Sequence, residues 1–143
     1  MVGRTPSRRR WPQRRTPTSI KTKIHGQWGS NGVDPIVVGN RAIYVQPQGS
    51  VVREIGYELE SDGLGGQNIS IISNHLLSGH EVIAMAYQQE PDSLIWVLRD
   101  DGVLLSLTYQ REHEVIAWTR HETEGVVESI CVIPGAEYDE LWM

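Results

Sequence analysis

The feature that most constrains the fold is a three-residue pattern that occurs three times. An aromatic residue stands between two hydrophobic residues at 43–45 (Ile-Tyr-Val), 95–97 (Ile-Trp-Val) and 141–143 (Leu-Trp-Met). Successive copies are roughly 50 residues apart, which is the spacing of β-propeller blades. A repeat of this kind cannot bury its own apolar face, so it needs a neighbour on each side. We therefore expect an all-β protein built of antiparallel meander sheets that resemble propeller blades.

Turn and strand signals divide most of the chain into repeats. We place these at about 34–60, 81–121 and 125–143. The second is the clearest, because it contains four alternating segments joined by turns, and four such strands make one propeller blade. The third ends at Met143 within its second expected strand. We therefore interpret residues 26–143 as an incomplete β-propeller-like domain.

The first repeat predicts three strands and then a loop. Its strands are expected at 36–38, 42–46 and 51–59, where short apolar runs are separated by turn residues. In the third strand, alternation predicts that the odd-numbered residues from Val51 to Leu59 share one face. The glycine-rich stretch at 61–66 predicts a flexible connection to the next repeat.

A short helix is predicted near residues 69–78. Ile69, Ile72 and Leu76 recur at intervals of three or four residues, and Gly79 offers a C-terminal stop. A strand at 69–72 is the alternative. The helix would be an insertion between the first two repeats.

The charge of the chain is divided unequally. The first acidic residue is Asp34, so all 18 Asp and Glu residues follow the basic start. Residues 1–25 are rich in Arg, Thr, Ser and Pro, and we expect a disordered basic tail there. A nucleic-acid-binding arm and an organelle transit peptide are the alternatives for this segment.

Cysteine content and hydropathy exclude some locations. The sequence has one cysteine, so no intramolecular disulfide can form. This residue, Cys131, is flanked by Ile130 and Val132, and we expect it to be buried and unreactive. No apolar run is long enough for a membrane-spanning helix. No signal-peptide core follows the basic start, so we expect no secretion by that route.

No residue is predicted to have a catalytic, cofactor-binding or metal-binding role. His75 and His80 are near each other in the sequence, but a metal site needs three or four ligands in a workable geometry. Asp100 and Asp101 precede Gly102, where they could bind calcium, but Asp-Asp-Gly is also ordinary hairpin-turn chemistry. We therefore predict a protein that is not an enzyme and has no cofactor.

Several longer stretches of the sequence resemble a family of bacteriophage virion proteins. The most specific are Val-Asp-Pro-Ile-Val-Val-Gly-Asn at 33–40 and Ala-Tyr-Gln-Gln-Glu-Pro-Asp-Ser at 86–93. Shorter matches continue at 99–104, 112–115, 117–118 and 139–142. The family consists of tail-associated or stabilisation proteins, similar in type to the propeller-bearing nozzle proteins of short-tailed phages. The resemblance covers about residues 28–142, and it also implies that the chain is a piece of a longer protein.

This resemblance implies a structural component of a phage tail or neck. Its partners would be other virion subunits, and the full-length protein would form a homo-oligomeric ring in the virion or, during assembly, in the host cytoplasm. Acidic loops around Glu122, Glu124 and Glu128 would influence which subunit docks.

Two other functions are open at this stage. The chain could be a carbohydrate- or receptor-binding module of a phage tail, in which Trp96, Trp118 and Trp142 stack on a cell-surface glycan. Packing of these tryptophans in the core is the competing interpretation. The other is that the chain is part of a glycan-hydrolysing enzyme, although no pair of carboxylates stands out as catalytic.

Overall fold

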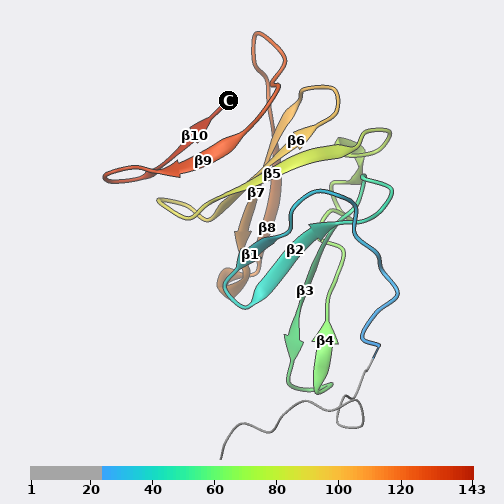
Figure 1. The fold of residues 1–143 in the computed structure, drawn as a ribbon. Coiled ribbons are helices and arrows are strands. Elements are labelled where there is room, and N and C mark those ends of the chain that lie inside the picture. Colours follow the sequence, from blue (N-terminus) through green and yellow to red (C-terminus); the bar gives the residue numbers. More distant parts are fainter. Residues whose placement is uncertain (1–23) are drawn as a thin grey trace, which may run out of the picture.

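The computed structural model describes residues 24–143, and these form a mainly antiparallel β structure with short turns (Figure 1). The prediction of an all-β fold is confirmed. The predicted basic tail at 1–25 lies outside the described residues, apart from its last two positions. Within the described part, no helix is both long and apolar enough to cross a membrane.

The described strands form three sheets in chain order. The first contains β1 (Ile36–Val38), β2 (Arg41–Val45), β3 (Val52–Glu58) and β4 (Gly63–Gly65). The second contains β5 (Val82–Gln88), β6 (Leu94–Arg99), β7 (Leu104–Gln110) and β8 (Val115–His121). The third contains β9 (Cys131–Pro134) and β10 (Asp139–Trp142). Every strand pairs with its neighbour in the sequence, so each sheet is a simple meander.

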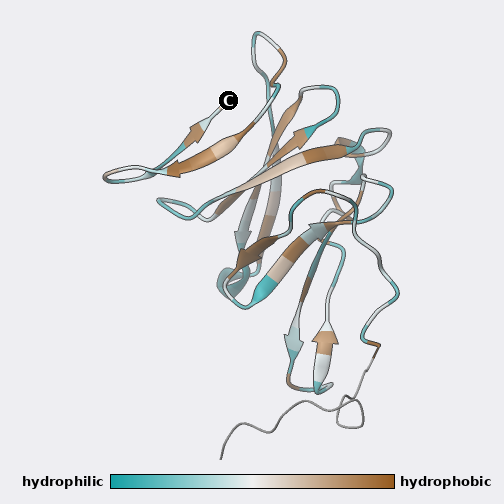
Figure 2. Cartoon of the chain, viewed as in Figure 1, coloured by the Kyte–Doolittle hydropathy of each residue, from teal (hydrophilic) through white to brown (hydrophobic). Residues whose placement is uncertain are grey.

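The second sheet follows its sequence pattern most closely. Asp100, Asp101 and Gly102 form the β6–β7 hairpin, and Gly102 has the positive φ of 76° that tight turns require. Hydrophobic residues are concentrated on the strands, and hydrophilic residues are common in the turns (Figure 2). Along β6, Ile95 and Val97 point to one side of the sheet, and Trp96 and Leu98 point to the other.

The first two sheets pack face to face around the larger core. Each fully buried aliphatic side chain in it contributes about 1.5–3 kcal/mol. The buried aliphatic residues from the strands of the two sheets are Ile43, Val45, Val52, Val82, Ile95, Val97, Leu105 and Leu107.

A smaller core lies on the other side of the second sheet. Leu98, Leu104 and Val127 are buried there, and Ile130 and Leu141 pack against them from the third repeat. The second sheet therefore has buried residues on both of its faces. The first strands of the sheets are adjacent, since β1 contacts β5 and β5 contacts β9. The arrangement resembles successive propeller blades, but the described sheets do not close into a ring.

The face that the odd-numbered residues of β3 share is the less buried one. Val52 and Glu54 are buried, whereas Tyr57 and Leu59 are exposed. Pairing of Glu54 with Ile43 places both residues on the face that meets the second sheet. The alternating apolar residues of β3 therefore lie on the opposite face.

The predicted loop at 61–66 contains the fourth strand of the first sheet. Its Gly65 pairs with Gly56 of β3. A Cβ atom on Gly66, just beyond β4, would lie 2.0 Å from the Glu54 carbonyl oxygen. Glycine is required there because the backbones approach closely, so these residues build the sheet edge rather than a flexible connection.

The helix predicted near 69–78 is limited to one 3-10 turn, η1 (Asn74–Leu76). Ile69 and Leu77 are buried, but Ile72 is 90% exposed, so the predicted apolar face does not form. The Ile69 amide donates instead to the Val52 carbonyl at 3.1 Å, which attaches this segment to β3. Tertiary contacts therefore override a weak helical period.

Candidate ligand cleft between the first two sheets

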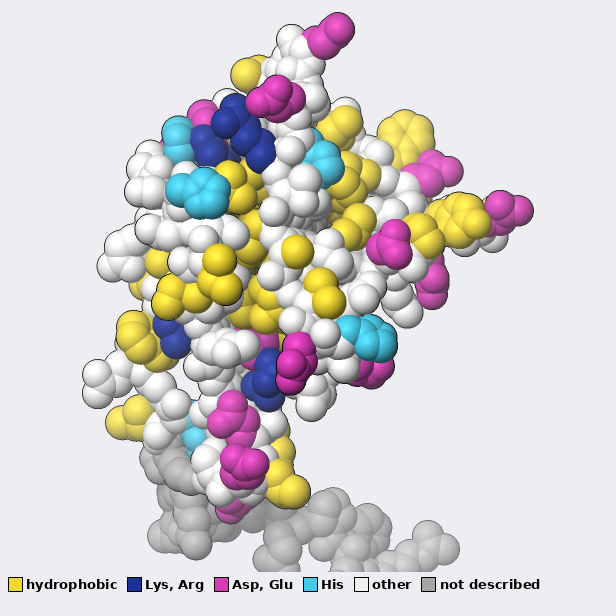
Figure 3. Space-filling view, turned by 180° about the vertical axis from the view of Figure 1, so that it is seen from behind, with side chains coloured by type: hydrophobic (Ala, Val, Ile, Leu, Met, Phe, Trp, Pro, Cys, Tyr) yellow, Lys and Arg dark blue, Asp and Glu magenta, His cyan; other side chains and the backbone are white. Residues whose placement is uncertain are grey.

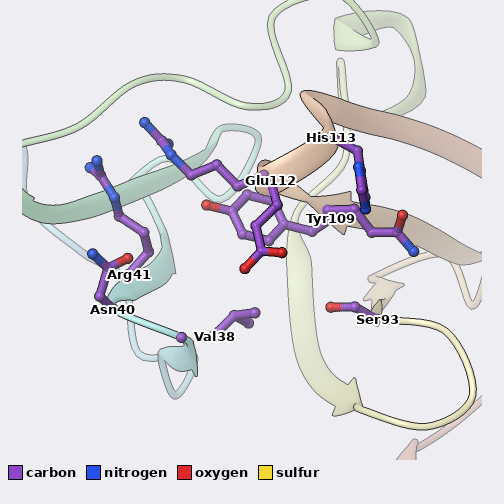
Figure 4. A pocket seen from close by; sticks show the side chains of 10 residues that line it. Val38, Asn40, Arg41, Ser93, Tyr109, Glu112 and His113 are labelled. Carbon is purple, nitrogen blue, oxygen red and sulfur yellow. The ribbon is translucent and has the colours of Figure 1, made fainter.

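A cleft of about 610 Å³ opens between the first and second sheets (Figure 4). One wall is the β1–β2 turn and the start of β2, and the other is the end of β7 with the following 3-10 turn, η2 (Arg111–His113). Its size lies within the usual range for small-molecule sites. The lining residues are Val38, Gly39, Asn40, Arg41, Ser93, Tyr109, Gln110, Arg111, Glu112 and His113.

A buried carboxylate joins the two sheets beside this cleft. Glu54 of β3 is 1% exposed, which would be costly for an unpaired charge. The Tyr109 hydroxyl donates to one of its oxygens, and the Arg111 guanidinium donates to the other. These two bonds provide the opposite charge and the donors that a buried carboxylate needs.

The same network fixes the protonation states of its partners. Burial, and then the Glu54 hydrogen bond, raise the pKa of Tyr109 above its ordinary value. The hydrogen bond to Glu54 likewise raises the pKa of Arg111. Near neutral pH, Tyr109 is therefore a neutral donor and Arg111 is a cation.

The charge of Arg41 is compensated much less well. The residue is only 8% exposed, and its Nε atom is buried without a hydrogen-bond partner in the described part of the chain. Its Nη1 donates to the Gly65 carbonyl at 3.5 Å and lies 3.7 Å from a Glu58 oxygen. Charge-assisted bonds are usually shorter than 3 Å. The side chain passes over Gly56, where a Cβ atom would lie 2.2 Å from the Arg41 Cδ.

The remaining lining groups are mostly neutral hydrogen-bonding side chains. In Figure 4, the Tyr109 hydroxyl points towards the Arg41 side, while Ser93 and His113 lie on the opposite side. The Glu112 carboxylate points towards Val38. Glu112 is exposed and is the one acidic side chain among the cleft's lining residues.

The histidine and aspartate candidates come together in an unexpected combination. His80 Nδ1 lies 3.2 Å from Asp100 Oδ1 and 3.5 Å from Asp101 Oδ2, while His75 is exposed in η1. Arg99 pairs with both oxygens of Asp101 and lowers the pKa of that carboxyl. Because Arg99 already occupies Asp101, the group is a salt-bridge network at a hairpin turn.

Two of the three candidate tryptophans have structural roles. Trp96 Nε1 donates to Gln88 Oε1 at 2.8 Å, and Trp118 Nε1 donates to the Ile69 carbonyl at 2.9 Å. Both rings are partly buried against the cores. Trp142 is 57% exposed on β10, so it alone of the three presents most of its ring to the surface.

The predicted burial of Cys131 is wrong. The residue is exposed in β9, because Val132 takes the more buried position and alternation turns both Cys131 and Ile133 outwards. Glu122, Glu124 and Glu128 are exposed, which agrees with their expected place in surface loops.

Sequence reasoning missed the groups around the cleft. The strand itself gave no distinctive signal, since Glu54 is one of three charged residues in β3, with Arg53 and Glu58. Its partners, Tyr109 and Arg111, lie more than 50 residues away. Their meeting depends on how the two sheets pack.

Comparison with known proteins does not assign the chain to a family. No protein-family model matches the sequence, and no curated protein matches it significantly. The resemblance to phage virion proteins therefore stays a prediction.

Proposed function

We propose that this protein is a non-enzymatic structural component of a bacteriophage or prophage virion, in the tail or neck. It would act through protein–protein interfaces in which one sheet packs on the face of another. The class of particle comes from the sequence resemblance described above. The mode of action is supported by the second sheet, which is covered on both faces by its neighbours.

The observation that carries this proposal is the outward surface of the β9–β10 hairpin. Ile133, Tyr138 and Trp142 are each about half exposed there, between 47% and 58%. In Figure 3 the projecting hairpin carries hydrophobic and acidic side chains together. Within the described residues, β10 pairs only with β9. Its other edge is occupied at Asp139, which bonds Gln88 and Glu90, and is open for pairing beyond that residue. An apolar surface beside an open strand edge suits a further β-sheet as partner.

Symmetry would multiply these contacts. If the hairpin of one subunit packs on another, repetition around a ring combines many weak interfaces. The exposed acidic residues near the hairpin, including Glu128, Glu137 and Glu140, would favour a partner with a basic rim.

The experiment is sedimentation velocity over a range of protein concentrations. The wild-type chain is expected to self-associate, and Trp142→Asp should shift it towards monomer because it places a charge in the interface. Ile72→Asp is the matched control, since Ile72 is an exposed apolar residue away from the hairpin. A wild-type chain that is monomeric at every concentration would contradict the proposed interface. The virion assignment itself requires detection of the chain by mass spectrometry in purified phage particles.

A glycan-binding role is the second candidate, and the exposed ring of Trp142 favours it. A glycan array with the wild-type chain should then give signals that Trp142→Ala abolishes. Equal signals from both proteins, or none from either, would dismiss a role for this ring.

A further inference from the structure

The cleft wall contains a buried cation, Arg41, whose charge lacks a close counterion among residues 24–143. A guanidinium has five N–H donors, and within this part of the chain Arg41 makes one hydrogen bond, at the 3.5 Å limit. Its carboxylate neighbour, Glu58, is 3.7 Å away and has a side chain that is 42% exposed. Removing a charge from water without close compensation is costly. This arrangement is therefore unfavourable unless another group compensates the charge of Arg41.

A second guanidinium lines the same cavity under different constraints. Glu54 accepts a hydrogen bond from Arg111 Nη1, which fixes the position of the side chain. The Arg111 side chain is 44% exposed, so part of it can reach a molecule in the cleft. Rigid support of this kind preorganises a binding group.

We propose that the cleft binds a small molecule through an oxyanion, a carboxylate or phosphate group, held by Arg41 and Arg111. The planar, forked arrangement of guanidinium donors matches such groups. This inference does not depend on the virion assignment. It needs only the geometry of the first two sheets.

The rest of the lining restricts the ligand. Asn40, Ser93, Gln110 and His113 supply hydrogen-bonding groups for a polar body. A dianion doubles both the repulsion from Glu112 and the attraction to the two arginines, so charge alone does not select the ligand. The hydrogen-bonding groups favour a carboxylate on a polar molecule, such as an acidic sugar, over inorganic phosphate, because only the larger molecule has a polar body for them to contact.

The first test is an NMR titration of the full chain with glucuronate, inorganic phosphate and sodium chloride at equal ionic strength. The Arg41 Nε–H is buried, so slow exchange with water should keep its resonance visible. Glucuronate should shift that resonance saturably and raise the melting temperature. Phosphate should act in the same way at higher concentration, and sodium chloride should not. Equal responses to all three salts, or no response, would overturn the proposal.

Two variants test the residues without relying on a damaged fold. Glu112→Gln, at an exposed position, should tighten glucuronate binding by about fivefold because it removes a nearby like charge. Arg41→Met should weaken binding by at least about tenfold, and its melting temperature without ligand should be unchanged or higher, since an apolar side chain replaces a poorly paired charge. Arg120→Lys, an exposed arginine outside the cleft, is the control and should bind as wild type does.

These outcomes separate a binding role from a structural one. A lower melting temperature for Arg41→Met together with unchanged glucuronate binding would make Arg41 a packing residue and overturn the proposal. If Arg41→Met does not fold, Glu112→Gln decides, because unchanged or weaker glucuronate binding in that variant contradicts the assigned cleft.

Discussion

The two interfaces between the sheets are built differently. The first buries a large aliphatic core and closes with the buried carboxylate of Glu54, which Tyr109 and Arg111 bond. Among the described residues, the second buries Leu98, Leu104 and Val127, and hydrogen bonds lie at its margin. We therefore expect the third sheet to be attached less strongly than the first two are to each other, because less apolar surface is buried there.

The hydrogen bonds at the edge of the second interface converge on one residue, Asp139. One Asp139 carboxylate oxygen, Oδ2, accepts from the Gln89 amide at 2.7 Å and from the Glu90 amide at 3.1 Å. The side chain of Gln88 donates to the Asp139 carbonyl at 3.0 Å. These bonds connect the end of β5 to the start of β10. They are largely exposed to water and contribute less than buried bonds.

The largest expected effect on stability comes from the larger core, between the first two sheets. Leu107→Ala removes a fully buried side chain and should lower the free energy of unfolding by about 2–5 kcal/mol. Urea denaturation followed by tryptophan fluorescence measures this change. The control is Leu59→Ala, at a position that is 83% exposed, which should change stability by less than about 0.5 kcal/mol. Equal losses in both variants would contradict the placement of the core.

The next effect concerns the buried carboxylate. Glu54→Gln preserves shape but removes the charge that Arg111 pairs with. The free energy of unfolding should fall by about 1–3 kcal/mol, because the amide cannot accept from both partners as the carboxylate does. The measurement is again urea denaturation, with the exposed Glu60→Gln as control. An unchanged free energy of unfolding would show that Glu54 does not bridge the two sheets.

A smaller and more local effect is expected at the second interface. Asp139→Asn weakens its bonds to the Gln89 and Glu90 amides and should cost about 0.5–1.5 kcal/mol. Hydrogen exchange should quicken in β9 and β10 while β6 and β7 keep their protection. Uniform acceleration across all three sheets would show that the third sheet is not a separate unit.

The smallest expected effect is on the pH dependence of stability in acid. Arg99 lowers the pKa of Asp101 from its ordinary value of 3.8. The stabilisation is therefore fully present above pH about 4 and is lost as pH falls through the lowered folded-state pKa. Thermal melts across this window should show a shallower acid decline for Asp101→Asn than for wild type. Parallel declines would mean that this surface pair does not contribute.

Several elements could be read directly from the sequence. The Asp-Asp-Gly hairpin between β6 and β7 was predictable because one local feature, the positive φ of Gly102, determines the turn. The strands of the second sheet were also predictable, because alternation and turn residues agree along the whole repeat. Local signals of this kind need no knowledge of distant residues.

Other elements were decided by contacts that no local pattern contains. The buried face of β3 follows from its pairing with β2, which places Glu54 opposite Ile43. The glycine at position 66, just beyond β4, is explained by the closeness of the β3 backbone. Residues 69–78 form a turn because their backbone bonds to the first sheet.

Periodicity and turn chemistry act over a few residues, and they are enough to predict an all-β protein of repeated meanders in which each sheet is expected to need a neighbour. No local pattern predicts that Arg41, Glu54 and Arg111 gather beside one cleft. These side chains come from β2, β3 and η2, so their meeting depends on strand register and on how two sheets pack, and both are set by the folded chain as a whole.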